Sequence, residues 1–276
     1  AAVSSGYCRS SMEKQPNGDS QPSGGSSAPW PEKSGDGEQP HSGHSIFRKV
    51  RFATTLTAVF LAMTASSAAK DVYVEKLGGD PIVMGIVFFA VSFVSPINEI
   101  ISGRLQNKNV LRRCFPIEKW GRKAPWLFSH TIMLALATGA LYLPPSRDVF
   151  VVHAWFFVVS VWVLWSISTC LIAFESCRQE LYPYNEERTG VEFFCKITVA
   201  VGIVLAALPL LVLLANSALW LRIAASLMFA VSILASGLQA KPIWMEASST
   251  SKEDEAPHIC DDIKVTWGNR AFRHLV

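Results

Sequence analysis

Six long apolar runs occupy most of this 276-residue chain and limit the folds open to it. They lie at about 52–69, 81–102, 127–143, 150–174, 194–215 and 219–238. A helix needs about 17 to 25 apolar residues to cross the hydrocarbon core of a bilayer, and these runs have that length. The pattern therefore predicts an all-α membrane protein with six transmembrane helices.

The composition agrees with this interpretation. Half of the residues are hydrophobic and 17% are charged, whereas soluble domains are about one-quarter charged. The first run is the least apolar, because several Thr and Ser residues interrupt it. Small hydroxyl residues in a span indicate a helix that faces other helices or a polar cavity.

A strongly basic loop between the second and third runs sets the expected orientation. Residues 104–126 carry seven basic side chains and one acidic one. Further basic residues, Arg48, Lys49 and Arg51, precede the first run, and Lys241 follows the sixth. Lys and Arg are retained on the cytoplasmic side of short membrane loops. We expect a multi-pass protein with both ends in the cytoplasm, and the sequence leaves open which cellular membrane holds it.

The chain divides into three regions by composition. Residues 1–45 are rich in Gly, Ser, Pro, Gln and charge, which predicts a disordered cytoplasmic tail. Residues 46–240 form the expected six-helix transmembrane bundle, and residues 241–276 form a polar, acidic cytoplasmic linker followed by the amphipathic start of a seventh helix. No apolar segment with a cleavage site precedes the first run, so that run is expected to act as the insertion signal.

Nothing in the sequence indicates catalysis. Five cysteines fall in the spans or in presumed cytoplasmic loops without metal-ligand spacing, namely Cys114, Cys170, Cys177, Cys195 and Cys260, and Cys8 lies in the tail. We find no nucleophile–base pair and no phosphate-binding loop. We therefore expect a protein that is not an enzyme, has no cofactor or metal, and does not bind nucleic acid.

Charged residues near the span ends are the candidate functional groups. Glu175 and Arg178 are three residues apart at the end of the fourth span, where they can pair on one helix face. They form either an interfacial ion pair that ends the helix or a gate or substrate contact. Lys196 follows Glu192 by four residues and can pair in the same way, whereas Arg222 can snorkel to the interface.

Two further residues have alternative interpretations. Glu99 lies near the end of the second span, where a desolvated carboxylate would be a protonatable site. Alternatively, it reaches the interface and meets the basic loop. His153 lies among aromatic residues and is interpreted as interfacial, with a proton relay as the alternative.

Two motifs give the chain a resemblance to a known family. Residues 121–126 read GRKAPW and resemble the GRRRPW signature of the glycoside-pentoside-hexuronide:cation symporters of the major facilitator superfamily. Residues 180–189 read ELYPYNEERT and are similar to that family's PELTPDYDERT stretch, and residues 269–272 resemble the start of its seventh helix. The resemblance implies the N-terminal six-helix bundle of a twelve-helix fold, with the C-terminal half as a missing partner.

The same resemblance implies a cytoplasmic gate. Basic residues after the second span, Arg112, Arg113, Arg122 and Lys123, would pair with Glu180, Glu186 and Glu187 in one state and separate in the other. Simple anchoring of the loop by its positive charge is the alternative. The candidate gate residues are Gly121, Arg122, Lys123, Trp126, Glu180, Glu187 and Arg188.

The second span departs from the family's DAxxDP ion-binding pattern. The same register reads Ser95-Pro96-Ile97-Asn98-Glu99-Ile100, so one carboxylate is lost and Glu99 replaces the other. A hard cation prefers several oxygen ligands, so proton coupling or facilitated diffusion fits better than sodium coupling. The candidate coupling and cavity residues are Glu99, Asn98, Ser95, Glu175, Arg178 and Lys196.

The resemblance therefore implies a secondary active transporter that moves a sugar or a lysolipid-like small solute by alternating access. Its expected partners are that solute, the lipid bilayer and the missing half. The alternative is a membrane sensor or scaffold that does not transport, which the missing carboxylates favour. The chain is either a fragment of a twelve-helix protein or a natural half-length product, a choice that the sequence leaves open.

Overall fold

The computed structural model describes residues 43–108, 110–215 and 218–246, and in these residues the chain is helical and has no strand. The long helices are α1 (Ile46–Lys76), α2 (Pro81–Asn107), α4 (Ala124–Leu141), α5 (Val149–Leu181), α6 (Asn185–Ala215) and α7 (Leu219–Leu238). Short helices α3 (Ile117–Trp120) and α8 (Lys241–Trp244) and a 3₁₀ turn (Val110–Arg113) complete this part of the chain. Six helices are long and apolar enough to cross a membrane, which confirms the predicted fold class.

The helices extend beyond the apolar runs that predicted them. α5 continues through the charged residues 175–181, and α6 begins at Asn185, about two turns before the predicted start. Hydropathy detects only the turns that contact apolar surroundings, whereas a helix continues until its backbone bonding is interrupted. The candidate gate and coupling residues of these segments therefore lie on helices. Most of the predicted tail, and residues 247–276, lie outside the described residues.

Side-chain caps fix where three of the long helices begin. The Ser45 hydroxyl accepts a hydrogen bond from the Arg48 amide, and the Asp80 carboxylate accepts from the amides of residues 82 and 83. Asp148 accepts in the same way from the amides of residues 150 and 151. Each cap satisfies amides that have no partner within their helix, and a carboxylate also interacts favourably with the helix dipole.

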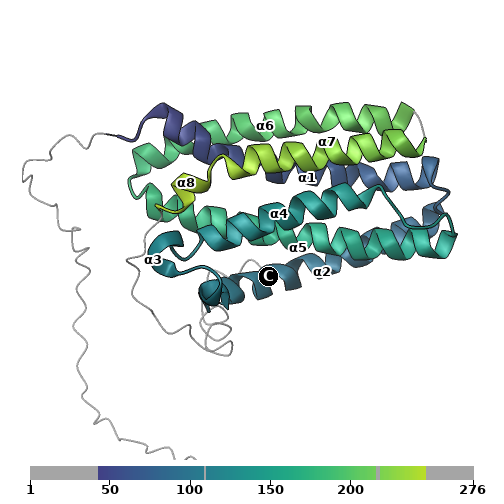
Figure 1. Ribbon diagram of the computed structural model, residues 1–276, viewed down its shortest axis with the longest axis horizontal. Helices are drawn as coiled ribbons and strands as arrows, with labels where there is room; N and C mark the ends of the chain where they lie inside the picture. Colours follow the sequence, from purple (N-terminus) through teal and green to yellow (C-terminus); the bar gives the residue numbers. More distant parts are fainter. Residues whose placement is uncertain (1–42, 109, 216–217, 247–276) are drawn as a thin grey trace, which may run out of the picture. The chain divides into compact units, whose positions relative to one another are not determined.

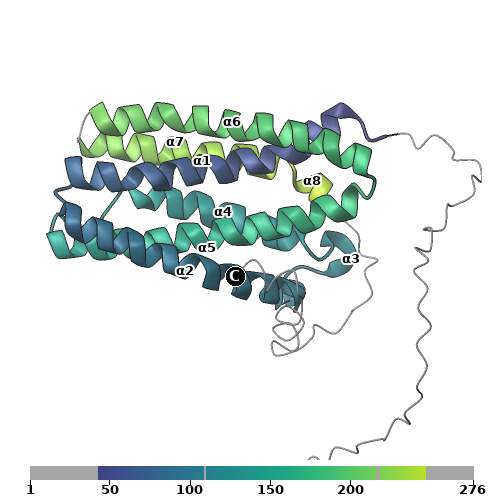
Figure 2. The same cartoon turned by 180° about the vertical axis from the view of Figure 1, so that it is seen from behind.

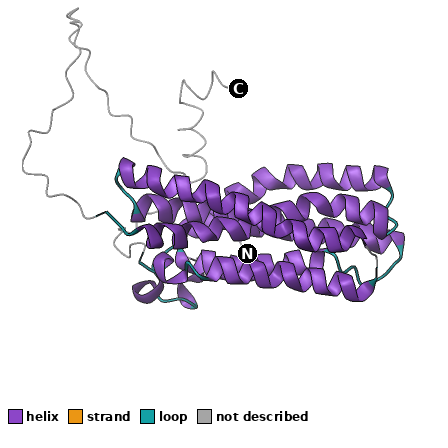
Figure 3. Ribbon diagram, turned by 90° about the horizontal axis from the view of Figure 1, so that it is seen from above, coloured by secondary structure: helices purple, strands orange, loops and turns teal. Residues whose placement is uncertain are grey.

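Successive long helices run in opposite directions along the bundle, so the packed pairs α1–α6 and α2–α5 are parallel (Figure 1). α1 packs against α6 and α7, α4 packs against α5 and α7, and α2 packs against α5. Seen from behind, α6 and α7 again lie along one side and α2 along the other (Figure 2). We call the end with α3 and α8 the basic end (Figure 1). Seen from above, the long helices run between this end and the opposite one (Figure 3). The opposite end carries residues 77–80, residues 142–148 and the start of α7.

Several polar side chains inside the bundle pair with one another or with the backbone. Thr57 donates to the Thr198 carbonyl at 3.0 Å, and Thr198 donates to the Ala53 carbonyl at 2.9 Å. Ser102 and Thr169 share a 2.8 Å hydrogen bond between α2 and α5, next to a bond from Gln106 to the Thr169 carbonyl. Hydrocarbon offers no hydrogen-bond partners, so these contacts hold the helices in register.

The packing of α1, α2 and α6 fits the composition of their sequences. The buried Thr55 and Thr57 of α1 face other helices, as the hydroxyl-rich first run predicted. α2 and α6 are the outer helices, and both present large apolar side chains to their surroundings. At the basic end, Trp244 of α8 is fully buried and donates a hydrogen bond to the Thr55 hydroxyl at 3.1 Å. Residues 241–246 thus pack onto the bundle.

Gly202 allows a close approach between α1 and α6. A Cβ atom at this position would lie 2.7 Å from the carbonyl oxygen of Thr57, which is a backbone atom and cannot rotate away. Residue 202 therefore has to be glycine for the two helices to pack at this distance.

We predict that Gly202→Ala lowers the free energy of unfolding by roughly 1–3 kcal/mol, because the added methyl group forces α1 and α6 apart. Thermal unfolding of the protein in detergent micelles measures the effect. Gly85→Ala is the matched control, since no atom lies within 4 Å of its added Cβ and alanine is the better helix former. Equal stability of the two variants would contradict the described α1–α6 contact.

Candidate functional site

A groove of about 320 Å³ opens between α1, α2 and α5, midway along the bundle. Half of its lining consists of serines from all three helices, and the remainder is apolar. The lining residues are Met63, Ser66, Ser67, Phe88, Val91, Ser92, Ser95, Ser160, Leu164 and Ile167. None of these lining residues carries a charge.

Helical periodicity brings these residues to one face of each helix. The lining residues of α1, of α2 and of α5 recur at spacings of three or four, which is the spacing of neighbours on a helix surface. Ser67 and Ser92 donate to carbonyl groups of their own helices at 2.9 and 3.0 Å. The Ser160 hydroxyl is buried and has no hydrogen-bond partner in the protein. The groove thus offers both satisfied and available hydroxyl groups.

The structure separates the three predicted residues of α2. Ser95 lines the groove, as a cavity residue should. Asn98 is 3% exposed and lies on the face of α2 that packs against α5. Glu99 is exposed on the described bundle, so these helices do not bury its carboxylate. Glu99 follows Ser95 by four residues, so it lies on the same face of α2, one turn nearer the basic end.

The predicted pairs on α5 and α6 form as expected. The Arg178 guanidinium lies 2.7 Å from the Glu175 carboxylate, and the Lys196 ammonium lies 3.6 Å from the Glu192 carboxylate. All four lie toward the basic end and outside the lining of the groove, and Cys195 lies within electrostatic reach of Glu175, Arg178 and Glu192. The candidate cavity residues therefore form two groups, one on α2 and one on α5 and α6.

The GRKAPW motif folds into the turn that starts α4. Gly121 follows α3 with φ of 66°, a conformation that glycine adopts without strain. Lys123 is buried and interacts electrostatically with Glu180 and Arg122. Burial lowers the pKa of Lys123, the Glu180 carboxylate opposes this shift, and the Arg122 guanidinium adds to it. Trp126 is buried and stacks on His130 with ring centroids 5.6 Å apart.

The remaining gate residues have different partners. The Glu187 carboxylate accepts a 2.8 Å hydrogen bond from the His44 amide and lies 3.2 Å from the His44 ring nitrogen. Arg188 donates to the carbonyls of Tyr182 and Pro183 at 3.4 and 3.3 Å, across the turn between α5 and α6. The predicted gate thus divides into Arg122, Lys123 and Glu180 on one side and Glu187 with Arg188 on the other.

Sequence reasoning missed the contacts that hold the start of α1. The Arg48 guanidinium lies 2.5 Å from the Glu246 carboxylate, and the His44 ring meets the Tyr182 ring edge-on at 5.3 Å. Burial raises the pKa of Tyr182 to about 12, an effect that the positive charge of Arg48 opposes. We call His44, Arg48, Tyr182, Glu187 and Glu246 the N-terminal clasp. Its members are far apart in the sequence, so no local pattern connects them.

His153 has a structural role near the opposite end. Its side chain is 9% exposed, and its Nε2 accepts a 3.0 Å hydrogen bond from the Asp80 amide. This bond ties the loop between α1 and α2 to the first turns of α5. Because Nε2 accepts this hydrogen bond, this nitrogen carries no proton in the contact.

The family model described as MFS/sugar transport protein matches residues 49–276. The match includes five of the long helices completely and all but the first three residues of α1. Curated proteins and solved structures gave no match.

We predict that Glu187→Ala loosens the N-terminal clasp. Loss of the carboxylate leaves the His44 amide without its acceptor, so hydrogen exchange of residues 44–48 becomes roughly tenfold faster. Exchange measured by mass spectrometry tests this. Glu186→Ala removes the same charge from an exposed neighbouring position and serves as the control. Equal protection in the two variants would show that Glu187 does not hold this segment.

Proposed function

Because the chain belongs to the family of MFS/sugar transport proteins, we propose that it is a symporter-like secondary transporter. Its proposed substrate is an uncharged, hydroxyl-bearing solute, and the preferred class is a sugar. The observation that carries this proposal is the serine-lined groove between α1, α2 and α5. The chain is an integral, multi-pass membrane protein of a transporter family.

The chemistry of the groove supports a neutral, hydroxylated solute. A serine hydroxyl both donates and accepts hydrogen bonds, and so does each hydroxyl of a sugar. None of the described residues that line the groove is charged, so an ionic substrate would lose its hydration there without a compensating partner. The apolar side chains of Met63, Phe88 and Leu164 offer a surface for the carbon skeleton. A lysolipid-like amphiphile is the second substrate class, because the outer faces of α2 and α6 are apolar.

Alternating access requires a second bundle over this groove. Transporters built from repeats bind their substrate between two bundles that rock against each other. We propose that a further six-helix bundle encloses the groove, with the buried Ser160 hydroxyl at its floor. The groove volume of about 320 Å³ is at the lower end for small-molecule sites, which fits one half of a shared cavity.

We place the basic end on the cytoplasmic side, since its loops carry the excess of Lys and Arg. Cys114 is exposed at this end, whereas Cys170, Cys177 and Cys195 are buried. In a variant with Cys8 and Cys260 replaced by serine, we expect a membrane-impermeant maleimide to label Cys114 from the cytoplasmic side alone. Cys114→Ser is the control, and labelling of intact cells from outside would reverse the orientation.

Glu99 is the candidate coupling residue. It lies on the same face of α2 as Ser92 and Ser95, one turn nearer the basic end. Its side chain is exposed on the described bundle. One carboxylate supplies too few oxygen ligands to bind a sodium ion. We therefore favour proton coupling through Glu99, with facilitated diffusion as the alternative.

We predict that removing two groove hydroxyls weakens substrate binding. For the full-length protein in liposomes, Ser66→Ala with Ser95→Ala should raise the KM for sugar uptake about tenfold, since each lost hydrogen bond contributes roughly 0.5–1.5 kcal/mol. Ser236→Ala is the control, because Ser236 bonds the Ser232 carbonyl of its own helix and lies outside the groove. A panel of labelled sugars and lysolipids identifies the substrate class.

The same assay separates a transporter from a sensor or scaffold. Glu99→Gln should abolish uptake driven by a pH gradient and preserve exchange of substrate without a gradient. A uniporter would show equal uptake in the wild type and the variant. Absence of flux for every solute and gradient would reject transport and favour the scaffold.

A further inference from the structure

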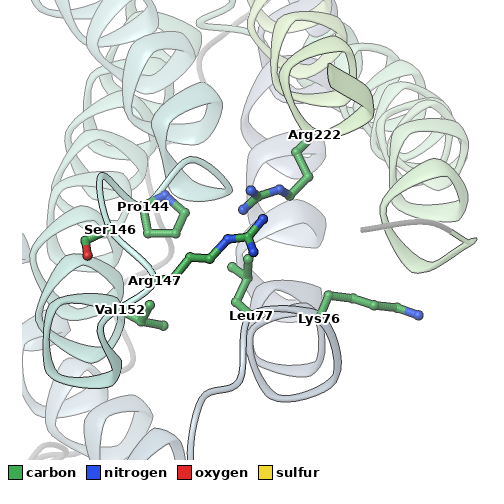
Figure 4. Close-up of a pocket in the computed structure, with 7 residues that line it drawn as sticks. All are labelled: Lys76, Leu77, Pro144, Ser146, Arg147, Val152 and Arg222. Carbon is green, nitrogen blue, oxygen red and sulfur yellow. The ribbon is translucent and has the colours of Figure 1, made fainter. Parts of the chain in front are cut away.

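A second pocket of about 320 Å³ lies at the opposite end of the bundle, away from the serine-lined groove. It is formed by the end of α1, the loop between α4 and α5, and the start of α7. Its lining residues are Lys76, Leu77, Pro144, Ser146, Arg147, Val152 and Arg222 (Figure 4). Three of these residues are cationic and none is acidic. We call this the cationic pocket.

The two arginines of the cationic pocket converge. Figure 4 shows their guanidinium groups directed toward each other, whereas the Lys76 side chain extends away from them at the rim. Arg147 comes from the loop after α4, and Arg222 from the first turn of α7. The charge of Arg147 acts unfavourably on Arg222, so the approach of these groups is not a source of stability by itself.

No carboxylate neutralises these charges in the part of the chain that the structure describes. None lies within ion-pair distance of Lys76, Arg147 or Arg222. Asp148 follows Arg147 directly, but its carboxylate accepts from two amides at the start of α5. The Asp80 carboxylate of the same end is occupied in the same way at the start of α2.

The Arg222 side chain is buried and incompletely hydrogen-bonded. The side chain is 7% exposed, and its Nε is buried without a hydrogen-bond partner. A buried, charged donor without an acceptor is costly, and a bound anion removes that cost by supplying both the acceptor and the opposite charge. The sequence predicted that Arg222 can snorkel to the membrane interface, and the structure directs its side chain into this pocket at the end of the bundle.

We propose that the cationic pocket binds a phosphate group. A tetrahedral oxyanion presents oxygens in several directions, so one phosphate can bridge the two facing guanidiniums, each of which offers paired donors. The Ser146 hydroxyl also lines the pocket and can donate to the same anion, and Lys76 adds long-range attraction. A carboxylate is flat and carries less charge, so it matches two opposed guanidiniums less well.

The position of the cationic pocket allows two sources of phosphate. The pocket lies where three spanning helices end or begin, which is the depth of lipid headgroups in a bilayer. A lipid headgroup and a free, soluble phosphate present the same chemistry to the two arginines. This site is separate from the serine-lined groove, so it does not depend on the proposed transport activity.

The test uses the full chain in maltoside micelles, which contain no phosphate. Thermal unfolding is followed with inorganic phosphate in one arm and with short-chain phosphatidic acid in the other, against sodium chloride at equal ionic strength. We expect a saturable rise in Tm in at least one arm. A rise with inorganic phosphate identifies a soluble ligand, and a rise with phosphatidic acid alone identifies a headgroup. Absence of a rise in Tm in both arms overturns the proposal. A rise in Tm of equal size when acetate replaces phosphate also overturns it.

Three variants with the same loss of charge locate the site. Arg147→Gln and Arg222→Gln should each weaken phosphate binding about tenfold, whereas Lys108→Gln, exposed at the basic end, should leave it unchanged. Arg147 lies on an exposed loop, so its variant keeps the test valid even if Arg222→Gln does not fold. Wild-type affinity in Arg147→Gln would overturn the assignment.

Discussion

Hydrocarbon offers no hydrogen-bond partner, and the architecture of this protein depends on that constraint. Every backbone group in a spanning segment has to bond within its own segment, so the described chain crosses as helices. The same constraint gathers polar side chains between helices, where Thr57 bonds the Thr198 carbonyl and Ser102 bonds Thr169. The close approach at Gly202 places α1 near enough to α6 for the first of these bonds.

Two pockets of similar volume show how chemistry distinguishes sites within one bundle. The serine-lined groove lies midway along α1, α2 and α5 and has no charged lining residue, which suits a neutral solute that moves. The cationic pocket lies at one end of the bundle, where Arg147 and Arg222 face each other and none of the described lining residues is acidic. Charge near the interface can attract and hold an anion, whereas charge in the middle of a transport path would hold a neutral solute poorly.

The charged motifs at the basic end form two separate sets of contacts. Lys123 is buried next to Glu180, whereas Glu187 belongs to the N-terminal clasp with His44. The clasp connects the start of α1 with the turn between α5 and α6 and, through the Arg48–Glu246 pair, with the segment after α7. All of these contacts lie within the one described bundle, so they hold its helices together at the basic end.

The sequence by itself determined the number, order and approximate bounds of the spanning helices, because apolar length is a local property. It also determined the Glu175–Arg178 pair, since residues three apart on a helix are neighbours in any fold. Only the tertiary structure decided that Glu99 is exposed on the described bundle and that Arg222 lies in a pocket with Arg147. These outcomes depend on which face each helix turns to its neighbours, and hydropathy does not encode that rotation.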